Sequence, residues 1–393
     1  MSKKAFLSAN EAAAHGVRLS RPHVVAAYPI TPQTTLVEKI ADFLANGEAE
    51  FNYMMVESEH SAMAAAHGAS MMGARAFTAS SSQGLLYMCE MLSYVSGARH
   101  PVVMVDINRA TATPWNIYGD QRDALAMRDQ GWIMIFVESG QEALDAIIQA
   151  YRLAEDADVM TPVMVNLDGF TLSHTFDLVN IPDQEMVDKF LPPYNTTNRM
   201  DMNSPKTICP SVGPNFHAEV RVLQQAAFEV AKRKIVEIDA EYGKMFGRSY
   251  GGLVEEYKTE DADRVLVALG SVAGTIRVCV DALREKGEKV GMIKVRSLRP
   301  FPKEYFASLR GKFKSMGVIS RDISFGYEGT LFTEIKAAMS CPTTIFGNYI
   351  AGLGGRDIPK ALLFEVFEKL KQKEDGKEMD EVQFVGLRWD YGN

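Results

Sequence analysis

The 393-residue sequence predicts an α/β protein with two parts: a parallel sheet with helices on both faces, and a smaller α/β domain. Three observations lead to this prediction. Short apolar runs alternate with helical stretches up to about residue 180, a second alternating unit begins at Asp263, and a stretch rich in proline and asparagine separates the two. We therefore expect a first domain over residues 1–250, with an irregular linker at about 181–217, and a second domain over residues 260–393.

The first domain begins with short apolar runs that read as strands. They cover residues 24–28, 51–56, 76–80, 101–105 and 163–167. Apolar residues at helical spacing predict helices between them, over residues 35–45, 85–97 and 141–155. Ser58 can cap a further helix over residues 59–72, because its hydroxyl can accept a hydrogen bond from a free amide of the first turn. Strand–helix alternation of this kind favours a parallel sheet.

The second domain repeats the alternation on a smaller scale. A long amphipathic helix, at about residues 218–246, leads into it. The predicted strands cover residues 264–269, 290–295 and 317–320, and a helix over 273–286 ends at Gly287, a residue typical of helix C-termini. The charged tail after Leu370 is expected to fray.

Composition argues against several classes of protein. Lys and Arg total 42 against 50 Asp and Glu, a net charge of −8 without a basic run, so nucleic acid is a poor partner. No stretch offers the ~20 apolar residues that a membrane span needs. The N-terminal residues lack the apolar core of a signal peptide, so we expect a cytoplasmic protein. The four cysteines lie more than 60 residues apart, which excludes a CxxC metal or cluster motif.

The segment from Tyr28 to Thr35 directly follows a predicted strand. Its two prolines, Pro29 and Pro32, fix the backbone on either side of Thr31. Open parallel sheets bind ligands at the carboxyl ends of their strands, so Thr31 could present its hydroxyl to a ligand. The alternative is an ordinary turn followed by a helix cap.

Two carboxylates, Glu57 and Glu59, stand at the end of another predicted strand. Glu59 then opens a helix of mostly small residues, which lets a ligand or partner pack closely. A partly desolvated carboxyl at that boundary could hold or share a proton. The alternative is that Glu59 is an ordinary acidic residue favoured by the helix dipole.

Arg109 follows the apolar strand at 101–105 and precedes a loop, residues 114–121, that is dense in aromatic and polar side chains. An arginine there can fork onto a carboxylate, although a surface salt bridge would explain it as well. The glycine-rich stretches 326–329 and 352–357 match neither a P-loop nor a dinucleotide-binding motif. The Gly-Asp-Gly motif with which thiamine enzymes bind Mg²⁺ and diphosphate is absent.

Considered together, these segments resemble a known family. The most specific pieces are Ala27-Tyr28-Pro29-Ile30-Thr31-Pro32, Glu57-Ser58-Glu59-His60-Ser61-Ala62 and Thr78-Ala79-Ser80-Ser81-Ser82-Gln83-Gly84-Leu85, followed by residues 108–110, 119–121, 128–132, 172–174, 299–302 and 352–357. In order and spacing the sequence resembles the α subunit of multi-subunit 2-oxoacid:ferredoxin oxidoreductases, the pyruvate:ferredoxin oxidoreductase (pyruvate synthase) family. The resemblance covers nearly the whole chain.

The resemblance implies a thiamine diphosphate-binding fold, with a pyrimidine-binding domain followed by a domain like the C-terminal domain of transketolase. Glu59 would hydrogen-bond N1′ of the aminopyrimidine, and Pro29 and Ile30 would contact the cofactor. Thr31 and Arg109 would bind the substrate carboxylate. The reaction would be oxidative decarboxylation of a 2-oxoacid to acyl-coenzyme A and CO₂.

The family also implies partner subunits. A β subunit would carry Mg²⁺ and the diphosphate half-site, a γ subunit would join the complex, and 4Fe-4S iron–sulfur clusters in β and in a ferredoxin-like subunit would pass electrons to ferredoxin or another acceptor. The substrate stays open between pyruvate and a branched or aryl 2-oxoacid such as phenylglyoxylate. Two alternatives also stay open: an E1β-like subunit of a 2-oxoacid dehydrogenase complex, and a non-catalytic α/β scaffold subunit.

Overall fold

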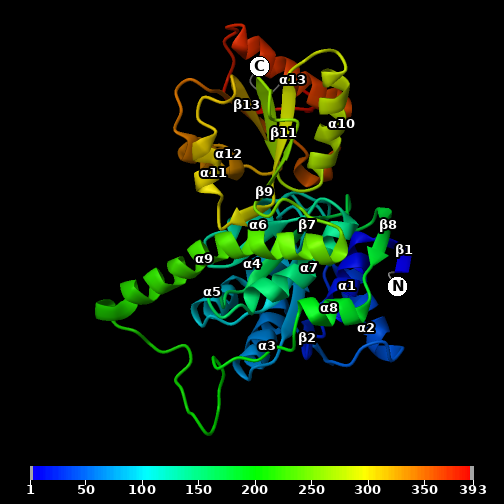
Figure 1. Cartoon of the computed structure of the whole chain (residues 1–393), viewed down its shortest axis with the longest axis vertical. Coiled ribbons are helices and arrows are strands. Elements are labelled where there is room, and N and C mark those ends of the chain that lie inside the picture. The colour runs from blue at the N-terminus through cyan, green and yellow to red at the C-terminus, as the bar shows by residue number, and fades with distance from the viewer. Residues whose placement is uncertain (1–2, 390–393) are drawn as a thin grey trace.

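The computed structural model describes residues 3–389, which form two α/β parts stacked end to end (Figure 1). In the larger part seven strands form one sheet. In spatial order they are β12 (Ser297–Arg299), β6 (Ile133–Phe136), β7 (Val163–Asp168), β5 (Val103–Asn108), β4 (Ala76–Ser80), β2 (Val24–Ala27) and β3 (Asn52–Met55). Every neighbouring pair is parallel except β12 with β6. The predicted parallel sheet is confirmed, although β6 and β12 were not expected.

Helices cover both faces of this sheet, as predicted. One face carries α1 (Ala9–Leu19), α2 (Thr34–Ala45), α7 (Gly140–Ala154) and the inner part of α9 (Pro214–Phe246), and the other carries α3 (Glu59–Met71), α4 (Ser82–Tyr87), α5 (Cys89–Gly97) and α6 (Arg122–Ala126). The strands are apolar on both sides: Val103 and Val105 of β5 face the first set of helices, and Met104 faces the second. Fully buried strands of this kind explain why the sequence shows continuous apolar runs.

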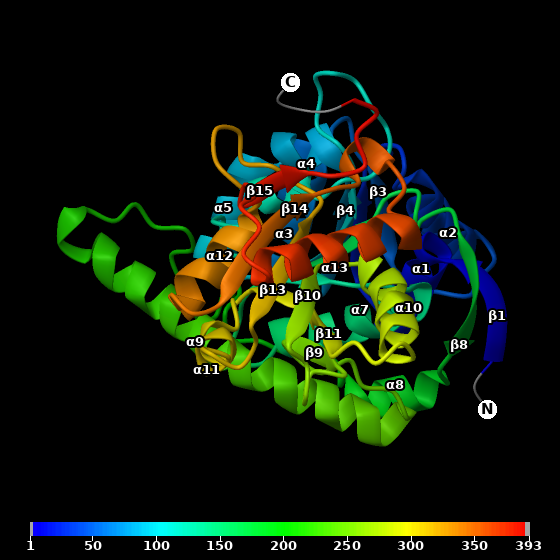
Figure 2. The same ribbon diagram turned by 90° about the horizontal axis from the view of Figure 1, so that it is seen from above.

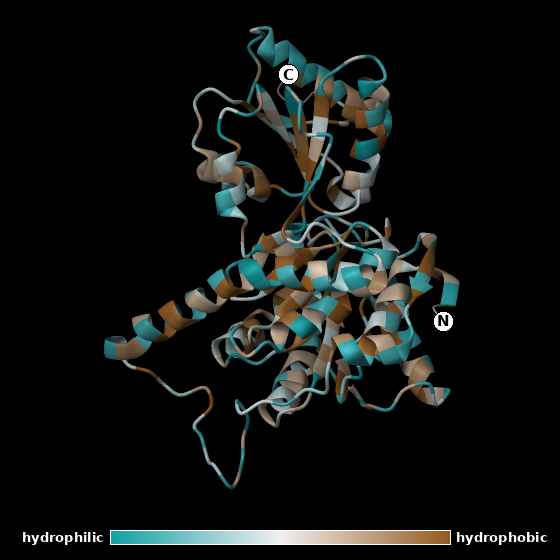
Figure 3. Cartoon of the chain, in the orientation of Figure 1, coloured by the Kyte–Doolittle hydropathy of each residue, from teal (hydrophilic) through white to brown (hydrophobic). Residues whose placement is uncertain are grey.

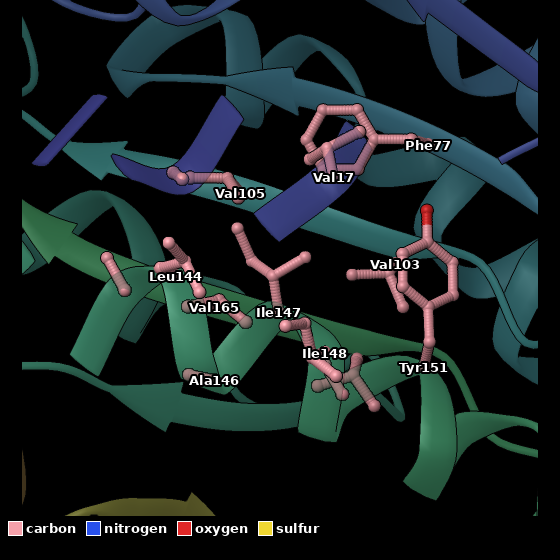
Figure 4. Close-up of a cluster of buried hydrophobic side chains, with 14 of the residues drawn as sticks. Val17, Phe77, Val103, Val105, Leu144, Ala146, Ile147, Ile148, Tyr151 and Val165 are labelled. Carbon is pink, nitrogen blue, oxygen red and sulfur yellow. The ribbon is translucent and has the colours of Figure 1, made fainter. Parts of the chain in front are cut away.

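The core on the first face is dense where α7 packs on α1. Ile147 and Tyr151 of α7 share one buried cluster with Val103 of the sheet and Val17 of α1 (Figure 4). A side chain at Gly16 would place its Cβ 2.7 Å from the main-chain oxygen of Leu144, so the two helices can approach only because residue 16 is glycine.

The smaller part holds a six-stranded sheet. Its spatial order is β15 (Val382–Phe384), β14 (Ile345–Ile350), β13 (Ser315–Ser320), β10 (Arg264–Ala268), β11 (Val290–Val295) and β9 (Val254–Tyr257), with β9 antiparallel. Helices α10 (Val272–Arg284) and α13 (Lys360–Glu374) pack on one face, and α11 (Lys303–Ser308) and α12 (Thr330–Met339) on the other (Figure 2). The central strands are mostly hydrophobic (Figure 3), and the charged residues Arg264 and Lys294 within them are buried.

The two parts are joined by more than their connecting chain. One apolar cluster runs from Phe136 of the first sheet to Phe306 beside the second. A buried ion cluster lies next to it: the carboxylate of Glu142 in α7 accepts from Lys294 Nζ at 2.6 Å and from Arg296 Nε at 2.9 Å. Because all three side chains are at most 2% exposed, each charge depends on the others for its neutralisation.

Three boundaries differ from the predictions. The helix expected over residues 85–97 begins at Ser82 and is divided at Met88 into α4 and α5. The long helix begins at Pro214, because proline is well tolerated in the first turn of a helix. The expectation that the chain frays after Leu370 is wrong for the described part of the tail: α13 continues to Glu374 and β15 pairs with β14. Residues 390–393 lie outside the described residues.

Several further elements were not predicted. Strand β1 (Lys3–Ser8) pairs antiparallel with β8 (Phe176–Ile181), and a short helix, α8 (Gln184–Phe190), lies within the stretch expected to be irregular. The outer part of α9 and the chain that leads to it project from the body (Figure 1). Among residues 3–389, no helix is long and apolar enough to cross a membrane.

Candidate active site

The carboxyl ends of four neighbouring strands, β3, β2, β4 and β5, bring their following turns to one edge of the larger sheet. This is the edge at which open parallel sheets bind ligands. All five predicted site residues lie in these turns: Pro29, Ile30 and Thr31 after β2, Glu59 after β3 and Arg109 after β5. Glu59 and Arg109 are buried, whereas Pro29 and Thr31 are exposed.

The buried side-chain amide of Gln33 connects the turn after β2 to the neighbouring strand β4. Gln33 Nε2 donates to the main-chain oxygen of Ala79 in β4 at 3.1 Å, and Gln33 Oε1 accepts from the amide of Ile30 at 3.3 Å. Asn10 Nδ2 donates to the oxygen of Pro32 at 2.8 Å. The turn is therefore anchored at both ends, and its exposed residues are presented on a rigid base.

Glu59 is the first residue of α3, as predicted, and only 8% of it is exposed. Its carboxyl packs against Gly84, where an added Cβ would lie 2.6 Å from Glu59 Oε1 and 2.6 Å from Ser80 Oγ. Neither the carboxyl of Glu59 nor the hydroxyl of Ser80 has a hydrogen-bond partner among residues 3–389. The residue as a whole is largely buried, while its carboxyl oxygens still reach solvent, so the carboxyl is available to a ligand that binds at this edge of the sheet.

Glu57, two residues earlier, lies in a different environment. It is exposed and accepts a hydrogen bond from the hydroxyl of Ser61, which lowers the pKa of its carboxyl. Ser58 accepts from the amide of Ser61 at 3.2 Å, which confirms the predicted helix cap. Glu57 is thus a paired surface carboxylate, whereas Glu59 is buried and unpaired.

Arg109 is only 4% exposed and meets the turn after β2. Its Nη1 donates to the main-chain oxygen of Thr31 at 2.8 Å, its Nε donates to that of Asn116 at 3.3 Å, and its guanidinium carbon lies 5.4 Å from the ring centre of Trp115. Nη2 has no partner in the part of the chain that the structure describes. Burial lowers the pKa of Arg109 and nearby Asp123 opposes this, so the group stays cationic and one edge is left for an anion.

Asp123 holds the backbone of this site together. It is fully buried, and its Oδ2 accepts from the amides of Arg109 at 2.8 Å and Ser82 at 2.9 Å. Its Oδ1 accepts from the amide of Ala124 at 2.8 Å. One carboxylate thereby joins the turn after β5 to the turn after β4.

A second buried acid, Asp106, lies beside Asp123. Asn108 Nδ2 bridges them, at 2.7 Å from Asp106 Oδ2 and 3.4 Å from Asp123 Oδ1. Burial, together with the neighbouring Asp123, raises the pKa of Asp106 well above its usual range, and burial raises the pKa of Asp123 to about 7. Three amides favour the charged form of Asp123, so Asp123 releases its proton first and Asp106 is the acid that stays protonated as pH rises.

The loop after Arg109 is fastened to the smaller part of the chain. Asn116 Nδ2 donates to the oxygen of Gly354 at 3.0 Å, and Asn116 Oδ1 accepts from the amide of Tyr118 at 2.6 Å. The amide of Gly354 approaches Asp120 Oδ2 at 3.4 Å. The glycine-rich stretch 352–357, which matches no nucleotide-binding motif, contacts the aromatic loop.

A second junction lies nearby. Asp168, at the end of β7, accepts from the amide of Ser271 at 2.7 Å and from Gln121 Nε2 at 3.1 Å, and Arg321 Nη1 lies 2.9 Å from its Oδ1. Ser271 and Arg321 belong to the smaller part. The loop that carries Asn116 and Gln121 is therefore fixed at two points by the second sheet and its turns.

Sequence reasoning missed four residues that build the site: Gln33, Ser80, Asp123 and Asn116. Ser80 belongs to the segment of residues 78–85 and ends an apolar strand, where a hydroxyl is a candidate for ligand binding. Nothing local distinguishes Asp123 or Asn116, because their partners lie far away in the sequence. Among residues 3–389, no three His, Cys, Asp or Glu side chains are arranged to hold a metal ion.

Comparison with known proteins agrees with this geometry. Residues 15–240 match the family model described as pyruvate flavodoxin/ferredoxin oxidoreductase, thiamine diphosphate-binding, and residues 262–361 match pyruvate:ferredoxin oxidoreductase core domain II. The chain belongs to the pyruvate:ferredoxin oxidoreductase family. This result confirms the resemblance and decides against the E1β-like alternative.

Relatives within the pyruvate:ferredoxin oxidoreductase family are similar over their full length. The ketoisovalerate oxidoreductase subunit VorA of Pyrococcus abyssi is 46% identical over 389 residues, which is 98% of either chain. The pyruvate synthase subunit PorA of Methanothermobacter thermautotrophicus is 45% identical over 382 residues, 97% of this chain and 98% of that one. Because two relatives of nearly equal identity act on different 2-oxoacids by name, similarity alone does not fix the substrate.

Two solved structures share the fold. 2-Oxoglutarate:ferredoxin oxidoreductase from Magnetococcus marinus matches with a TM-score of 0.73 at 21% identity, over 94% of this chain. This chain spans 65% of the length of that one. A split-gene transketolase chain matches with a TM-score of 0.50 at 14% identity, over 95% of this chain and 97% of that one. The predicted thiamine diphosphate-type and transketolase-like fold is confirmed.

Thiamine diphosphate, which the family implies, fits the residues present. An aminopyrimidine needs a carboxyl beside its ring nitrogen, and Glu59 offers a carboxyl with no partner among residues 3–389. Gly84 and Ser80 lie directly against it: a Cβ at Gly84 would stand 2.6 Å from both Glu59 Oε1 and Ser80 Oγ, so the carboxyl keeps its place only because residue 84 is glycine. Pro29, Ile30 and Thr31 stand at the same edge of the sheet.

Proposed function

We propose that this chain is the α subunit of a thiamine diphosphate-dependent 2-oxoacid:ferredoxin oxidoreductase, and that it holds the pyrimidine half of a site completed by another subunit. The observation that carries the proposal is the unpartnered carboxyl of Glu59, a largely buried residue, at the sheet edge where Arg109 meets Thr31. Glu59 can exchange a proton with a ring nitrogen, and Arg109 can bind a carboxylate.

Glu59 is proposed to hold and move a proton at N1′ of the cofactor's aminopyrimidine. When bound, thiamine diphosphate supplies the nucleophilic carbon that attacks a 2-oxo group and accepts the electrons released as CO₂ departs. The packing of Glu59 against Gly84 fixes where its carboxyl lies. A general acid–base group in such a position typically contributes a rate factor of about 10²–10⁴.

Arg109 and Thr31 are proposed to bind the carboxylate of the substrate. The guanidinium is held by Thr31 and Asn116 through Nη1 and Nε, and Nη2 is left to donate. The Thr31 side chain, on an exposed turn above it, can add a hydroxyl. Charge-assisted hydrogen bonds of this type are each worth about 1.5–3 kcal/mol, and they fix which bond of the substrate breaks.

Partner subunits are proposed to supply what this chain lacks. Diphosphate is usually bound through Mg²⁺ with oxygen ligands, which we assign to a β subunit. Iron–sulfur clusters, assigned to the β subunit and a ferredoxin-like subunit, would take the electrons to ferredoxin or another acceptor, with a γ subunit completing the complex. Coenzyme A would accept the acyl group.

The substrate is proposed to be pyruvate or a related branched or aryl 2-oxoacid. Trp115 is 74% exposed and stands beside the carboxylate-binding Arg109, where it would contact the substrate's side chain. It is the residue we expect to distinguish small from large 2-oxoacids.

The test is a 2-oxoacid panel on the intact complex, with coenzyme A and an artificial electron acceptor, together with analysis of bound thiamine and iron. We expect acceptor reduction that requires both a 2-oxoacid and coenzyme A, in a complex that contains thiamine and iron. A complex with neither cofactor, or one that reduces no acceptor with any 2-oxoacid, would overturn the proposal.

A further inference from the structure

We propose that Asn116 is a positioning residue through which the second domain sets the place of Arg109, so that a glycine turn far from the chemistry controls how tightly the 2-oxoacid is bound. The inference rests on the proposed function of Arg109. It assigns a role to Asn116 and to the stretch 352–357 that neither the motifs nor the mechanism requires.

The main chain and the side chain of Asn116 bind different parts of the protein: the main chain binds Arg109, and the side chain binds the second domain. Its main-chain oxygen accepts from Arg109 Nε at 3.3 Å, so the loop fixes one edge of the guanidinium. Its side-chain amide donates to the main-chain oxygen of Gly354 at 3.0 Å, 238 residues away in the sequence. Its side-chain oxygen accepts from the amide of Tyr118 at 2.6 Å, which closes the loop upon itself. Asn116 is thus the direct link between Arg109 and the second domain.

The glycine turn is shaped to receive this side chain. Gly354 and Gly355 have φ of +63° and +80°, the left-handed region that other residues rarely adopt. A Cβ at Gly354 would lie 2.5 Å from Asn116 Nδ2, and one at Gly355 would lie 2.4 Å from Tyr118 Cβ. A Cβ at Gly354 would therefore displace the Asn116 side chain from its hydrogen bond to Gly354, whereas a Cβ at Gly355 would press on the loop itself at Tyr118.

The arrangement also explains where Trp115 stands. Trp115 is the residue before Asn116 and lies over the Arg109 guanidinium, 5.4 Å from its carbon to the ring centre. A shift of Asn116 would move the ring and the guanidinium together. Displacement of a binding group by about 1 Å can cost on the order of 10²-fold in rate, so the effect should be measurable.

The experiment compares Asn116→Ala, Gly354→Ala and the double variant in the assembled enzyme. We expect each single variant to raise KM for the 2-oxoacid by roughly 10-fold to 10²-fold, with a much smaller change in kcat and unchanged thiamine content. The clash at Gly354 requires the Asn116 side chain, so the double variant should be no worse than Asn116→Ala alone. Hydrogen exchange at residues 112–118 should accelerate in Asn116→Ala.

The matched control is Gly311→Ala. Gly311 also has a left-handed φ, +73°, and belongs to the smaller part of the chain, but nothing lies within 4 Å of the Cβ it would gain. The Gly311→Ala variant measures the effect of placing alanine in a left-handed backbone conformation without any steric clash. It should leave KM for the 2-oxoacid unchanged. The proposal would be overturned if Gly311→Ala and Gly354→Ala raised KM equally. It would also be overturned if the increases in KM from Asn116→Ala and Gly354→Ala were fully additive in the double variant.

Arg109→Ala separates this inference from the function on which it rests. If Arg109→Ala raises KM while Asn116→Ala and Gly354→Ala do not, the positioning role is wrong and the carboxylate site stands. If Arg109→Ala leaves KM unchanged, the carboxylate site itself is wrong.

Discussion

Nη1 of Arg109 donates a hydrogen bond to the main-chain oxygen of Thr31 at 2.8 Å, across 78 residues of sequence. The two residues follow different strands, β5 and β2, which are separated in the sheet by β4. Their contact gives the larger sheet a cation at the edge where ligands of such folds bind.

Replacing Arg109 by Ala should lower kcat/KM for the 2-oxoacid by about 10-fold to 10²-fold or more, because a charge-assisted contact worth about 1.5–3 kcal/mol is lost. The loss should appear mainly as a higher KM, with normal thiamine content. Arg109→Lys keeps the charge but not the planar fork and should recover only part of the affinity. Normal turnover by Arg109→Ala would assign this residue a purely structural role.

Replacing Glu59 by Gln should slow exchange of the cofactor's C2 proton and lower activity by about 10²–10⁴-fold, because the amide keeps the size of the side chain but cannot pass a proton. The measurement is proton–deuterium exchange followed by NMR in the assembled enzyme. Glu57→Gln is the control: this exposed carboxylate is already paired with Ser61, and its loss should leave exchange unchanged. The opposite pattern would move the assignment to Glu57.

The buried pair Asp106 and Asp123 should make stability fall as pH rises from about 5 towards 8. With the pKa of Asp106 raised well above its usual range and that of Asp123 raised to about 7, the folded chain keeps two protons below pH 7 that the unfolded chain releases. Stability therefore declines by up to about 2.8 kcal/mol per pH unit below pH 7, and by up to about 1.4 kcal/mol per pH unit above it, where Asp106 alone keeps its proton.

Asp106→Asn tests this directly, because the amide replaces the protonated acid at nearly the same size. The difference in unfolding free energy between this variant and the native chain, from denaturant titrations at pH 5 to 8, should grow in favour of the variant as pH rises. Parallel pH profiles would show that the pair holds no extra proton. Taking the difference removes the contributions of titrating groups that do not interact with Asp106, so that what remains belongs to the Asp106 and Asp123 pair.

Replacing Trp115 by Ala should shift preference towards 2-oxoacids with larger side chains, since an exposed ring beside Arg109 would be removed. We expect the ratio of kcat/KM for a branched 2-oxoacid to that for pyruvate to rise by about 10-fold, the usual range for reshaping an apolar pocket. Phe216, also exposed but on the outer part of α9 that projects from the body, provides a control at which the ratio should stay constant. An unchanged ratio in Trp115→Ala would place the specificity elsewhere.

The isolated chain should bind thiamine diphosphate weakly in calorimetry, with or without Mg²⁺. Binding a diphosphate through Mg²⁺ needs carboxylate or carbonyl ligands, and residues 3–389 hold no cluster of three acidic, His or Cys side chains suited to a metal. Tight, Mg²⁺-dependent binding by the chain alone would contradict a site divided between subunits.

The parts of the fold that could be predicted are those with local signals. Ser58 and Glu59 mark the start of α3 to the residue, because an N-cap serine and an acidic first turn act within one turn of helix. Thr31 could be assigned to the ligand-binding edge because it directly follows a strand of a parallel sheet, and the family resemblance joined Arg109 to it. Both inferences depend on a few neighbouring residues and a general rule of sheets.

What could not be predicted depends on distant contacts. Strand β1 is defined by its pairing with β8, where Lys3 stands opposite Ile181, and the short mixed run from Lys3 to Ser8 carries no such information. Asn116 acts through its hydrogen bond to Gly354, and Asp123 acts through its hydrogen bond from Ser82. Both partners lie far away in the sequence, so local patterns do not reveal them. The charged composition of the tail predicts fraying. The strand β15 forms nevertheless, because it pairs with β14, and this pairing leaves no signal in the tail's own sequence.

Strand β12 has a consequence for how the chain can be divided. It leaves the smaller part to complete the edge of the larger sheet beside β6, and Lys294 and Arg296 just before it neutralise the buried Glu142. A chain cut near residue 250 would expose the unpaired edge of β6 and leave a carboxylate buried without a counter-ion, two defects that favour aggregation and unfolding. The two halves therefore cannot be exchanged between relatives as independent modules: recombination within this family should succeed only where β12 and its two cations travel with the first sheet.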